Sequence, residues 1–452
     1  MPDTPYTNTR DALLKLDAQY CWHPFTQMHT AAPPLAVVNA ENEFLIDADG
    51  KRYFDAVSSW WVNIHGHSHP SIAKAIAAQA HCLEHVMFAG VTHPPAVKLA
   101  QQLVERAPAP MAKVFYSDNG STAIEVALKM AFQYWQNQGK PNKKRLIALE
   151  GGYHGDTFGA MATGRSSGFY DPFKPWLFDV DFIPIGTCAC TEEQALTALD
   201  DLLKSQADHI AALIVEPMIQ GASGMRFSRP EFVAQLCQRC QQAGVLVIFD
   251  EVFTAFGRTG TLFAADQVAE ANGQADIICI SKGLTAGFMP MGATLTSLAV
   301  YDAFLSDQVG QALLHGHSYT ANPLGCAAAL ASLDLFDQPD TWARIQAIEH
   351  QHQRWLTKLA CHPLIENPRV CGTIAAFELK STQNQYGSAA SQWIRQTFLE
   401  LGIVVRPLGN TVYWVPPYCT QPDTLEHAYH TLMDLLQRWG ALNAPSPGSE
   451  LF

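Results

Sequence analysis

Short apolar segments alternate with amphipathic segments along the chain from about residue 70 onward. The amphipathic segments repeat apolar residues every three or four positions, which predicts helices at 70–83, 94–106, 120–136 and 229–243. The apolar segments are short and rich in β-branched residues, as in parallel strands that are covered on both faces. They predict strands at Leu146–Leu149, Ala212–Glu216, Val245–Asp250, Asp276–Ile280 and Gly292–Thr296. Because a helix separates most of these strands, the pattern favours an α/β fold with a mainly parallel sheet between helices.

The two ends of the chain follow other patterns. Residues 33–64 alternate polar and apolar positions like short strands, with a turn at Asp49–Gly50. A long amphipathic helix is expected at 340–360, followed by strand–helix–strand material and a final helix near 423–440. This part of the chain therefore predicts a smaller α+β domain.

The length of the chain fits such a division. A chain of 452 residues can form two or three domains. We predict a large domain over 65–335 and a smaller domain over 336–452, which the N-terminal segment 1–64 joins. With 48% apolar and 16% charged residues, the composition is that of an ordinary globular protein.

The charge of the chain and the lengths of its apolar runs argue against a nucleic-acid partner and against a membrane span. The net charge is −13 and no basic stripe stands out, so a nucleic-acid partner is not expected. No stretch of 18 apolar residues offers a membrane span, and the first 20 residues lack the apolar core of a signal peptide. The 11 cysteines are scattered, as in reduced cytosolic proteins, so a cytoplasmic location is expected.

Three groups of cysteine and histidine residues have a faint likeness to metal ligands. They are Cys188 with Cys190, Cys237 with Cys240, and the alternating His65, His67 and His69. The cysteine pairs lack the further ligands that close a zinc site, and the histidines are interpreted in the same way. The sequence therefore predicts no metal site.

Two side chains that follow predicted strands can carry chemistry, because ligands of open α/β sheets collect at the carboxyl ends of strands. Asp250 ends one strand, and a carboxylate buried there needs a positive partner such as a protonated pyridine nitrogen. An aspartate that caps a helix is the alternative. Lys282 follows the next strand in a glycine-rich loop, where burial would lower its pKa and let it form a Schiff base with an aldehyde. A solvated lysine is the alternative.

A third segment, SDNGSTAIEVALKMA, opens a predicted helix at Gly120 and Ser121. The first amides of a helix and the positive end of its dipole suit a phosphate dianion, although a helix capped by Ser or Thr has the same pattern. Pyridoxal phosphate needs three such groups: an aspartate that keeps the pyridine nitrogen protonated, a lysine that forms the Schiff base, and a helix start that binds the phosphate. Their joint occurrence is far more specific than any one of them alone.

Five segments resemble the class III aminotransferases, which have the fold-type-I architecture. They are SDNGSTAIEVALKMA, EGGYHGDTFGAM, VEPMIQGASGM, DEVFTAFGRTG and SKGLTAGFMPMGA, and the likeness spans nearly the whole chain. The resemblance implies a pyridoxal-phosphate enzyme whose large domain has a mainly parallel sheet of the seven-stranded type. It also implies that Lys282 is the catalytic residue and carries the cofactor, and that Asp250 pairs with the pyridine nitrogen.

The resemblance assigns the other contacts of the cofactor as well. The residues that it implies are Gly120, Ser121, Tyr153, Asp250, Val252, Lys282, His317 and Ser318. Tyr153 and Val252 would lie against opposite faces of the ring. Ser318 lies in HGHSYTANP, which is similar to a loop that reaches across a dimer to the phosphate in the partner subunit. A homodimer with shared active sites is therefore expected.

Four further segments resemble one subgroup of the family, which transfers an amino group from S-adenosylmethionine to 8-amino-7-oxononanoate in biotin synthesis. They are the segments CWHPFTQM, SSWW, HGHSYTANP and RPLGNTVYWVPPY. The substrate contacts implied by this likeness are Phe25, Trp60, Trp61, Tyr153, Gly316, Arg406 and Tyr413. Arg406 would hold a carboxylate, and Trp60 and Trp61 would wall the pocket, with a core tryptophan pair as the alternative. Phe25 stands where the subgroup usually has tyrosine, so one hydroxyl is absent.

Other aminotransferases of the same family remain open as alternatives. Members that act on ω-amino acids often carry an arginine and a gating glutamate where this chain has Tyr413 and Ala222. These departures argue against an ornithine or 4-aminobutyrate site. An ω-amino acid:pyruvate aminotransferase, and lysine in place of S-adenosylmethionine as amino donor, stay possible on the residues alone.

Three hypotheses outside the family have less support from the sequence. A serine hydrolase would use GRSSG at 164–168, but Pro172 and Pro175 break the helix that this motif requires. A dinucleotide-binding fold would need a G-x-G-x-x-G segment after a strand, and none is present. A non-enzymatic relative would not need Lys282 and Asp250, which are both intact.

Overall fold

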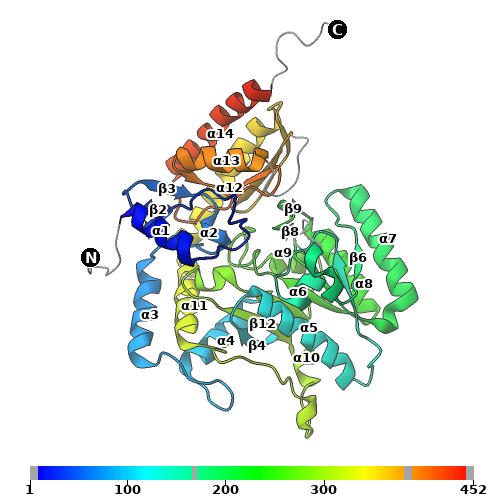
Figure 1. Cartoon of the computed structure of the whole chain (residues 1–452). Coiled ribbons are helices and arrows are strands. Elements are labelled where there is room, and N and C mark those ends of the chain that lie inside the picture. Colours follow the sequence, from blue (N-terminus) through cyan, green and yellow to red (C-terminus); the bar gives the residue numbers. More distant parts are fainter. Residues whose placement is uncertain (1–8, 165–169, 381–388, 444–452) are drawn as a thin grey trace.

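A seven-stranded sheet lies at the centre of the larger part of the molecule (Figure 1). The computed structural model describes residues 9–164, 170–380 and 389–443. The strands follow the order β4-β12-β11-β10-β7-β5-β6 across the sheet. They are β4 (Met111–Ser117), β5 (Arg145–Leu149), β6 (Asp181–Ile183), β7 (Ile210–Val215), β10 (Leu246–Asp250), β11 (Ile277–Ile280) and β12 (Gly292–Ser297).

The sheet is mainly parallel, as the sequence predicts. β10 runs parallel to β7 and β11, and β5 runs parallel to β7 and β6. β12 is antiparallel to both of its neighbours, β11 and β4. All five predicted strands are confirmed to within two residues. Two strands were not predicted: β4, which is partly exposed at an edge, and β6, which has only three residues.

Helices cover both faces of this sheet. Alternate residues of one strand belong to different hydrophobic clusters: Leu146 and Ala148 pack with α5, whereas Ile147 and Leu149 pack with the helices of the other face. This alternation explains why the strands are apolar throughout. The longer helices are α3 (Pro70–Cys82), α4 (Pro94–Arg106), α5 (Gly120–Asn137), α7 (Ala189–Gln206), α8 (Pro230–Gln242) and α11 (Pro323–Phe336). The four helices predicted between residues 70 and 243 are confirmed.

The smaller part of the molecule joins the two ends of the chain (Figure 1). Its four-stranded sheet has the order β1-β2-β3-β15, and β15 from near the C-terminus pairs with β3 in parallel. A three-stranded sheet has the order β13-β14-β16. The strands are β1 (Val37–Glu41), β2 (Phe44–Asp47), β3 (Arg52–Asp55), β13 (Ile365–Cys371), β14 (Ile374–Leu379), β15 (Ile403–Val404) and β16 (Thr411–Trp414). The helices are α12 (Pro339–Ala360), α13 (Ala389–Glu400) and α14 (Pro422–Asn443), of which α12 and α14 are close to the predicted ranges. The domain boundaries at residues 64 and 335 stay predictions.

The remaining elements are short, apart from the N-terminal helix. They are α1 (Arg10–Tyr20), α2 (Ser58–Trp61), α6 (Phe158–Ala162), β8 (Ile219–Gln220), β9 (Arg226–Phe227), α9 (Ala264–Glu270) and α10 (Leu298–Asp302), with the 3-10 helices η1 (Asp171–Trp176), η2 (Ala207–His209), η3 (Lys282–Thr285) and η4 (Val309–Gln311). Within the described ranges, no helix has both the length and the apolar character that crossing a membrane requires. The GRSSG segment lies outside the described residues except for Gly164.

Candidate active site

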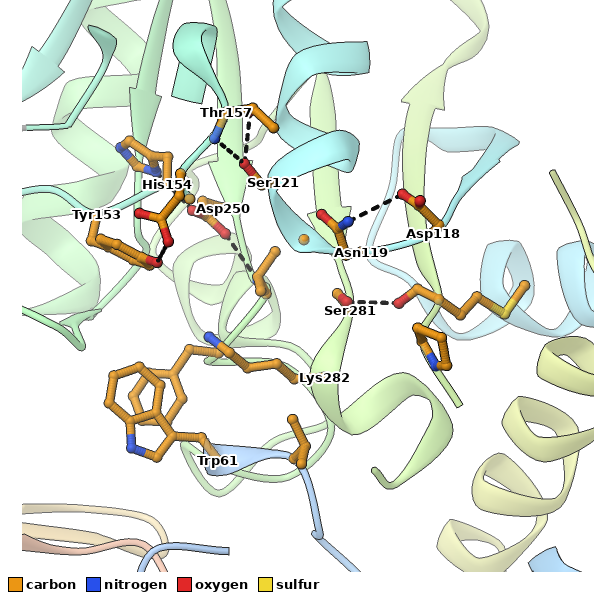
Figure 2. Close-up of a pocket in the computed structure, with 18 of the residues that line it drawn as sticks. Trp61, Asp118, Asn119, Ser121, Tyr153, His154, Thr157, Asp250, Ser281 and Lys282 are labelled. Carbon is orange, nitrogen blue, oxygen red and sulfur yellow. Dashed lines mark hydrogen bonds and ion pairs between the residues drawn. The ribbon is translucent and has the colours of Figure 1, made fainter. Parts of the chain in front are cut away.

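A cavity of about 640 Å³ opens where strands of the seven-stranded sheet end. The segments after five strands contribute to its wall: Asp118 to Ser121 after β4, Tyr153 to Thr157 after β5, Glu216 after β7, Asp250, Val252 and Phe253 at and after β10, and Ser281 with Lys282 after β11. Figure 2 shows Tyr153, His154 and Asp250 on one side of the cavity and Lys282 and Trp61 on the other. The structure thus brings Asp250 and Lys282, the two candidates at predicted strand ends, to the same cavity.

Asp250 presents a fixed carboxylate at the end of β10. The side chain is 4% exposed. Its Oδ1 accepts a hydrogen bond from the amide of Val252 at 3.0 Å, and its Oδ2 lies 2.7 Å from Nδ1 of His154. Burial acts to lower the pKa of His154, but the hydrogen bond and the negative charge of Asp250 outweigh burial and raise this pKa. A buried carboxylate with such partners can hold a cationic ring nitrogen in place.

Lys282 stands at the first position of η3, directly after Ser281. Its φ of 43° is in the left-handed region. The Nζ atom lies 4.7 Å from the ring centroid of Trp61 and 5.7 Å from that of Phe253. Burial lowers the pKa of Lys282 to about 8, although the negative charges of Asp250 and Glu216 act to raise it. Part of this amine is therefore unprotonated near neutral pH, as a nucleophile or base requires.

The start of α5 is shaped to receive an anion. Asn119 caps the helix: its Oδ1 accepts from the amide of Thr122 at 3.0 Å, and Oγ1 of Thr122 accepts from the amide of Asn119 at 3.1 Å. The amides of Gly120 and Ser121 have no acceptor within the helix, because they belong to its first turn. A Cβ on Gly120 would lie 2.6 Å from Cγ1 of Val252, so the glycine lets Val252 pack directly on the helix start. Gly120, Ser121 and Val252 all line the cavity.

The loop after β5 joins Tyr153 to the helix start. The hydroxyl of Tyr153 donates to Oδ2 of Asp156 at 3.1 Å. Burial, the charge of Asp156 and this hydrogen bond raise the pKa of Tyr153, so the hydroxyl stays protonated. Oγ of Ser121 accepts from the amide of Thr157 at 3.0 Å (Figure 2). These contacts hold the loop and the first turn of α5 together at one side of the cavity.

Glu216 holds two backbone segments beside the cavity. Its Oε1 accepts from the amide of Tyr153 at 2.9 Å, and its Oε2 accepts from the amide of Gly221 at 3.0 Å. Burial raises the pKa of Glu216 to about 7, against the opposing charge of His154. The carboxyl group therefore helps to fix the position of Tyr153.

Trp60 and Trp61 each have aromatic or cationic neighbours. Trp61 lines the cavity, and its Nε1 donates to the hydroxyl of Tyr413 at 3.2 Å. Trp60 does not line the cavity; the guanidinium carbon of Arg406 lies 4.0 Å from the centroid of its ring. Phe25 meets the same ring edge-on, with centroids 5.5 Å apart. The five residues predicted here thus form two sets of contacts, one around Trp61 and one around Trp60, which is its neighbour in the chain. Their roles toward a substrate stay predictions.

The loop with Gly316, His317 and Ser318 does not line the cavity within this chain. Gly316 and Ser318 are exposed, and Nε2 of His317 is buried without a hydrogen-bond partner in the described part of the chain. The roles of these residues therefore stay predictions.

Several residues of the site were missed from the sequence. His154 and Glu216 contact Asp250 or Tyr153 across 96 and 63 positions of the chain. His154 lies within the GGYHG segment and Glu216 at a predicted strand end, so both positions carried a signal. Their partners, however, lie far away in the sequence and could not be assigned from it. Among the described residues, no group of three or more histidine, cysteine, aspartate or glutamate side chains could hold a metal ion.

Comparison with known families agrees with this arrangement. Residues 26–436 match the family Aminotransferase class-III. The chain belongs to the class III aminotransferases. Among curated members, it is similar to the adenosylmethionine-8-amino-7-oxononanoate aminotransferase of Synechococcus elongatus, with 47% identity over 92% of this chain and 98% of the relative. The enzyme of the same name from Geobacter sulfurreducens is 40% identical over 96% of this chain and 99% of the relative.

Solved structures of class III aminotransferases have the same fold. The adenosylmethionine-8-amino-7-oxononanoate aminotransferase of Methanocaldococcus jannaschii superposes with a TM-score of 0.90 and 35% identity, and covers 95% of this chain and 99% of its own. An omega transaminase from Pseudomonas jessenii in complex with PMP has a TM-score of 0.88 and 27% identity, over 96% of this chain and 99% of its own. The predicted fold-type-I architecture is confirmed.

Proposed function

We propose that this class III aminotransferase transfers an amino group from S-adenosylmethionine to 8-amino-7-oxononanoate, a step of biotin biosynthesis, with pyridoxal phosphate as cofactor. The observation that carries the chemistry is that Lys282, Asp250 and the start of α5 line one cavity. The substrate rests on curated relatives of that name, which are up to 47% identical over almost the whole chain.

The residues of the cavity fit pyridoxal phosphate. The start of α5 offers amides to a phosphate dianion. Asp250 offers a buried carboxylate to a cationic ring nitrogen, and Lys282 an amine with a lowered pKa to an aldehyde. Tyr153 and Val252 come from different segments that line the same cavity and are proposed to contact opposite faces of the ring.

The bound cofactor supplies an aldehyde that takes up the amino group and a ring that spreads negative charge. Lys282 would take a proton from the substrate carbon and return it, because its pKa near 8 allows both protonation states. Asp250, fixed by His154 and by the amide of Val252, would keep the ring nitrogen protonated. Tyr153, held through its amide by Glu216, would pack against one face of the ring.

Arg406 is proposed to bind the carboxylate of either substrate. Its planar guanidinium is suited to a two-point contact with a carboxylate, and stacking on Trp60 orients it. Trp61 and Phe253 give the cavity an aromatic wall next to Lys282. Such a wall can face an adenine-bearing sulfonium or an aliphatic chain without a specific polar partner.

The working unit is proposed to be a homodimer in the cytoplasm. Val309, Leu314 and Tyr319 lie in or beside the loop of Gly316 to Ser318, and they are 77%, 71% and 63% exposed in one chain. Exposed apolar residues of this size support a partner surface at this place. In this dimer, His317 and Ser318 would reach the phosphate in the partner subunit. All eleven cysteines are free thiols, which fits a reducing compartment.

A second candidate is a class III aminotransferase with another amino donor, such as lysine or an ω-amino acid. This second candidate is supported by the structural likeness to the omega transaminase of Pseudomonas jessenii. Tyr413 and Ala222, which stand where many ω-amino acid enzymes carry an arginine and a glutamate, favour the first candidate.

The half-reaction decides between the two candidates. Purified protein is loaded with pyridoxal phosphate and mixed with S-adenosylmethionine, lysine, alanine or an ω-amino acid in separate experiments. Conversion of the visible absorption band by S-adenosylmethionine, followed by release of the product amine after 8-amino-7-oxononanoate is added, is the expected result. If only another donor converts the absorption band, the second candidate is correct and S-adenosylmethionine is not the amino donor.

A further inference from the structure

The turn that carries Trp60 and Trp61 has an unusual backbone. Ser58, Ser59 and Trp61 have φ angles of 50°, 59° and 68°, all in the left-handed region that residues with a Cβ rarely adopt. Such a backbone persists only where its surroundings impose it. Ser58 is tied to β16 and the segment after it, because its Oγ donates to the carbonyl of Val415 at 2.7 Å.

Asp55, which is fully buried at the end of β3, restrains this turn through two backbone amides. Its Oδ2 accepts a hydrogen bond from the amide of Ser59 at 2.6 Å, and its Oδ1 accepts one from the amide of Val57 at 3.4 Å. The same Oδ2 lies 2.8 Å from Nε2 of His67, which is 8% exposed. Asp55 and His67 thus form a buried pair directly behind the turn.

The strand that carries Asp55 also lies next to the strand that leads to Arg406. β3 and β15 are parallel neighbours, with Asp55 opposite Val404, two residues before Arg406. The tryptophan turn and the arginine therefore leave the sheet from the ends of adjacent strands. They meet in front of it, where Arg406 stacks on Trp60 and Trp61 faces the Nζ of Lys282.

We propose that the Asp55–His67 pair positions the aromatic wall of the substrate pocket, and so sets the affinity for substrate without contacting it. The pair holds Trp60 under Arg406 and Trp61 against Lys282 by imposing the backbone of Ser58 to Trp61. This inference rests on the proposed function, since it takes the tryptophans and Arg406 to face the substrate. His67 belongs to the alternating histidines that had no role from the sequence.

The kinetic test replaces Asp55 with asparagine, which loses the charge and turns one acceptor into a donor. Asp55→Asn should raise KM for the amino acceptor about tenfold, the effect of losing one charge-assisted hydrogen bond, and should change kcat by less than about threefold. Asp47→Asn is the matched control: Asp47 is also buried in this sheet and accepts from the Tyr53 hydroxyl at 2.9 Å, away from the turn. It should leave KM unchanged.

A second pair of variants separates positioning from general stability. His67→Gln keeps an N–H donor for Asp55 and should stay near the wild-type KM, whereas His67→Leu should raise KM as Asp55→Asn does. A merely structural role would lower kcat per total protein in proportion to the unfolded fraction, with KM unchanged, and that outcome would overturn the proposal. Thermal unfolding of each variant shows how much protein is folded.

A spectroscopic measurement without turnover tests the position of the two tryptophans independently of which substrate is correct. Protein labelled with 5-fluorotryptophan gives ¹⁹F signals that Trp60→Phe and Trp61→Phe assign. Asp55→Asn should shift both assigned signals and Asp47→Asn neither; unshifted signals in Asp55→Asn would refute the inference. If the wild-type protein fails to aminate 8-amino-7-oxononanoate, the proposed substrate is wrong. The KM comparison then uses whichever amino-carboxylate donor converts the visible band, so the two failures are distinguishable.

Discussion

At the scale of single residues, Lys282 gives the site its sharpest dependence on pH. Burial lowers its pKa to about 8, below the value of about 10.4 for a lysine in water. The unprotonated amine is the form that attacks an aldehyde, so its fraction rises with pH through the folded pKa. We expect the rate of cofactor uptake by the apoprotein to rise between pH 7 and 9 and then level off, as followed by the visible absorption band. A rate that still rises beyond pH 10 would contradict the lowered pKa.

Lys282 also allows a direct test of its chemical role. Lys282→Ala should abolish the absorption of the covalently bound cofactor and almost all turnover, since no other lysine lines the cavity formed by the described residues. Absorption spectra and product analysis measure the two effects. Multiple turnover at the wild-type rate would disprove the assignment.

Arg406 tests substrate recognition at the same scale. Arg406→Lys keeps the positive charge but loses the planar fork and the stacking on Trp60. KM for carboxylate substrates should therefore rise about tenfold or more, the effect of losing one charged hydrogen bond. An amine without a carboxylate serves as the control, and its conversion should change little. Equal effects on both substrates would place the arginine outside the carboxylate site.

At the scale of elements, the packing of α5 against the segment after β10 shapes the cofactor site. Gly120→Ala would bring a Cβ to 2.6 Å from Cγ1 of Val252, which pushes the helix start and Val252 apart. We expect cofactor affinity to fall at least about tenfold, as measured by equilibrium dialysis. Val252→Ala in the same chain should restore much of it by opening space. Gly310→Ala, which meets no atom within 4 Å, should have no effect.

The elements also show which parts of the fold can be predicted from the sequence. Apolar runs such as 146–149 and 245–250 located the inner strands, because residues buried on both faces must be apolar. The ends of those strands then located Asp250 and Lys282. Contacts between distant segments leave no periodic signal, and for that reason His154 beside Asp250 was missed.

The tryptophan turn shows the same limit at shorter range. The SSWW segment carried a signal for a pocket wall, but its left-handed backbone depends on Asp55, His67 and Val415. Neither composition nor spacing predicts such a backbone for serine and tryptophan. Asp250 and Lys282, which line the cavity, could thus be found from the sequence, and their roles toward a cofactor stay predictions. The residues that hold the SSWW turn in place required the folded chain.

At the scale of the whole molecule, both ends of the chain contribute to the proposed substrate wall. The β1-β2-β3 strands from the N-terminal part pair with β15, and the wall combines Trp60 and Trp61 with Arg406 and Tyr413. The segments that follow strands of the seven-stranded sheet supply the residues proposed to hold the cofactor, from the middle of the chain. The site therefore lies where the two parts meet, and the loop of Gly316 to Ser318 is left on the outside, available to a partner subunit.

Subunit mixing tests whether this loop serves its own chain or the partner. Lys282→Ala lacks the catalytic amine, and Ser318→Glu places a negative charge where the loop would meet a phosphate. Each variant alone should be nearly inactive. If the loop crosses the dimer, a mixed dimer pairs the intact lysine of one subunit with the intact loop of the other in one of its two sites. Equal amounts, unfolded and refolded together, should then recover about a quarter of wild-type activity, because about half of the dimers are mixed. If the loop serves its own chain, every site carries one defect and the mixture stays inactive.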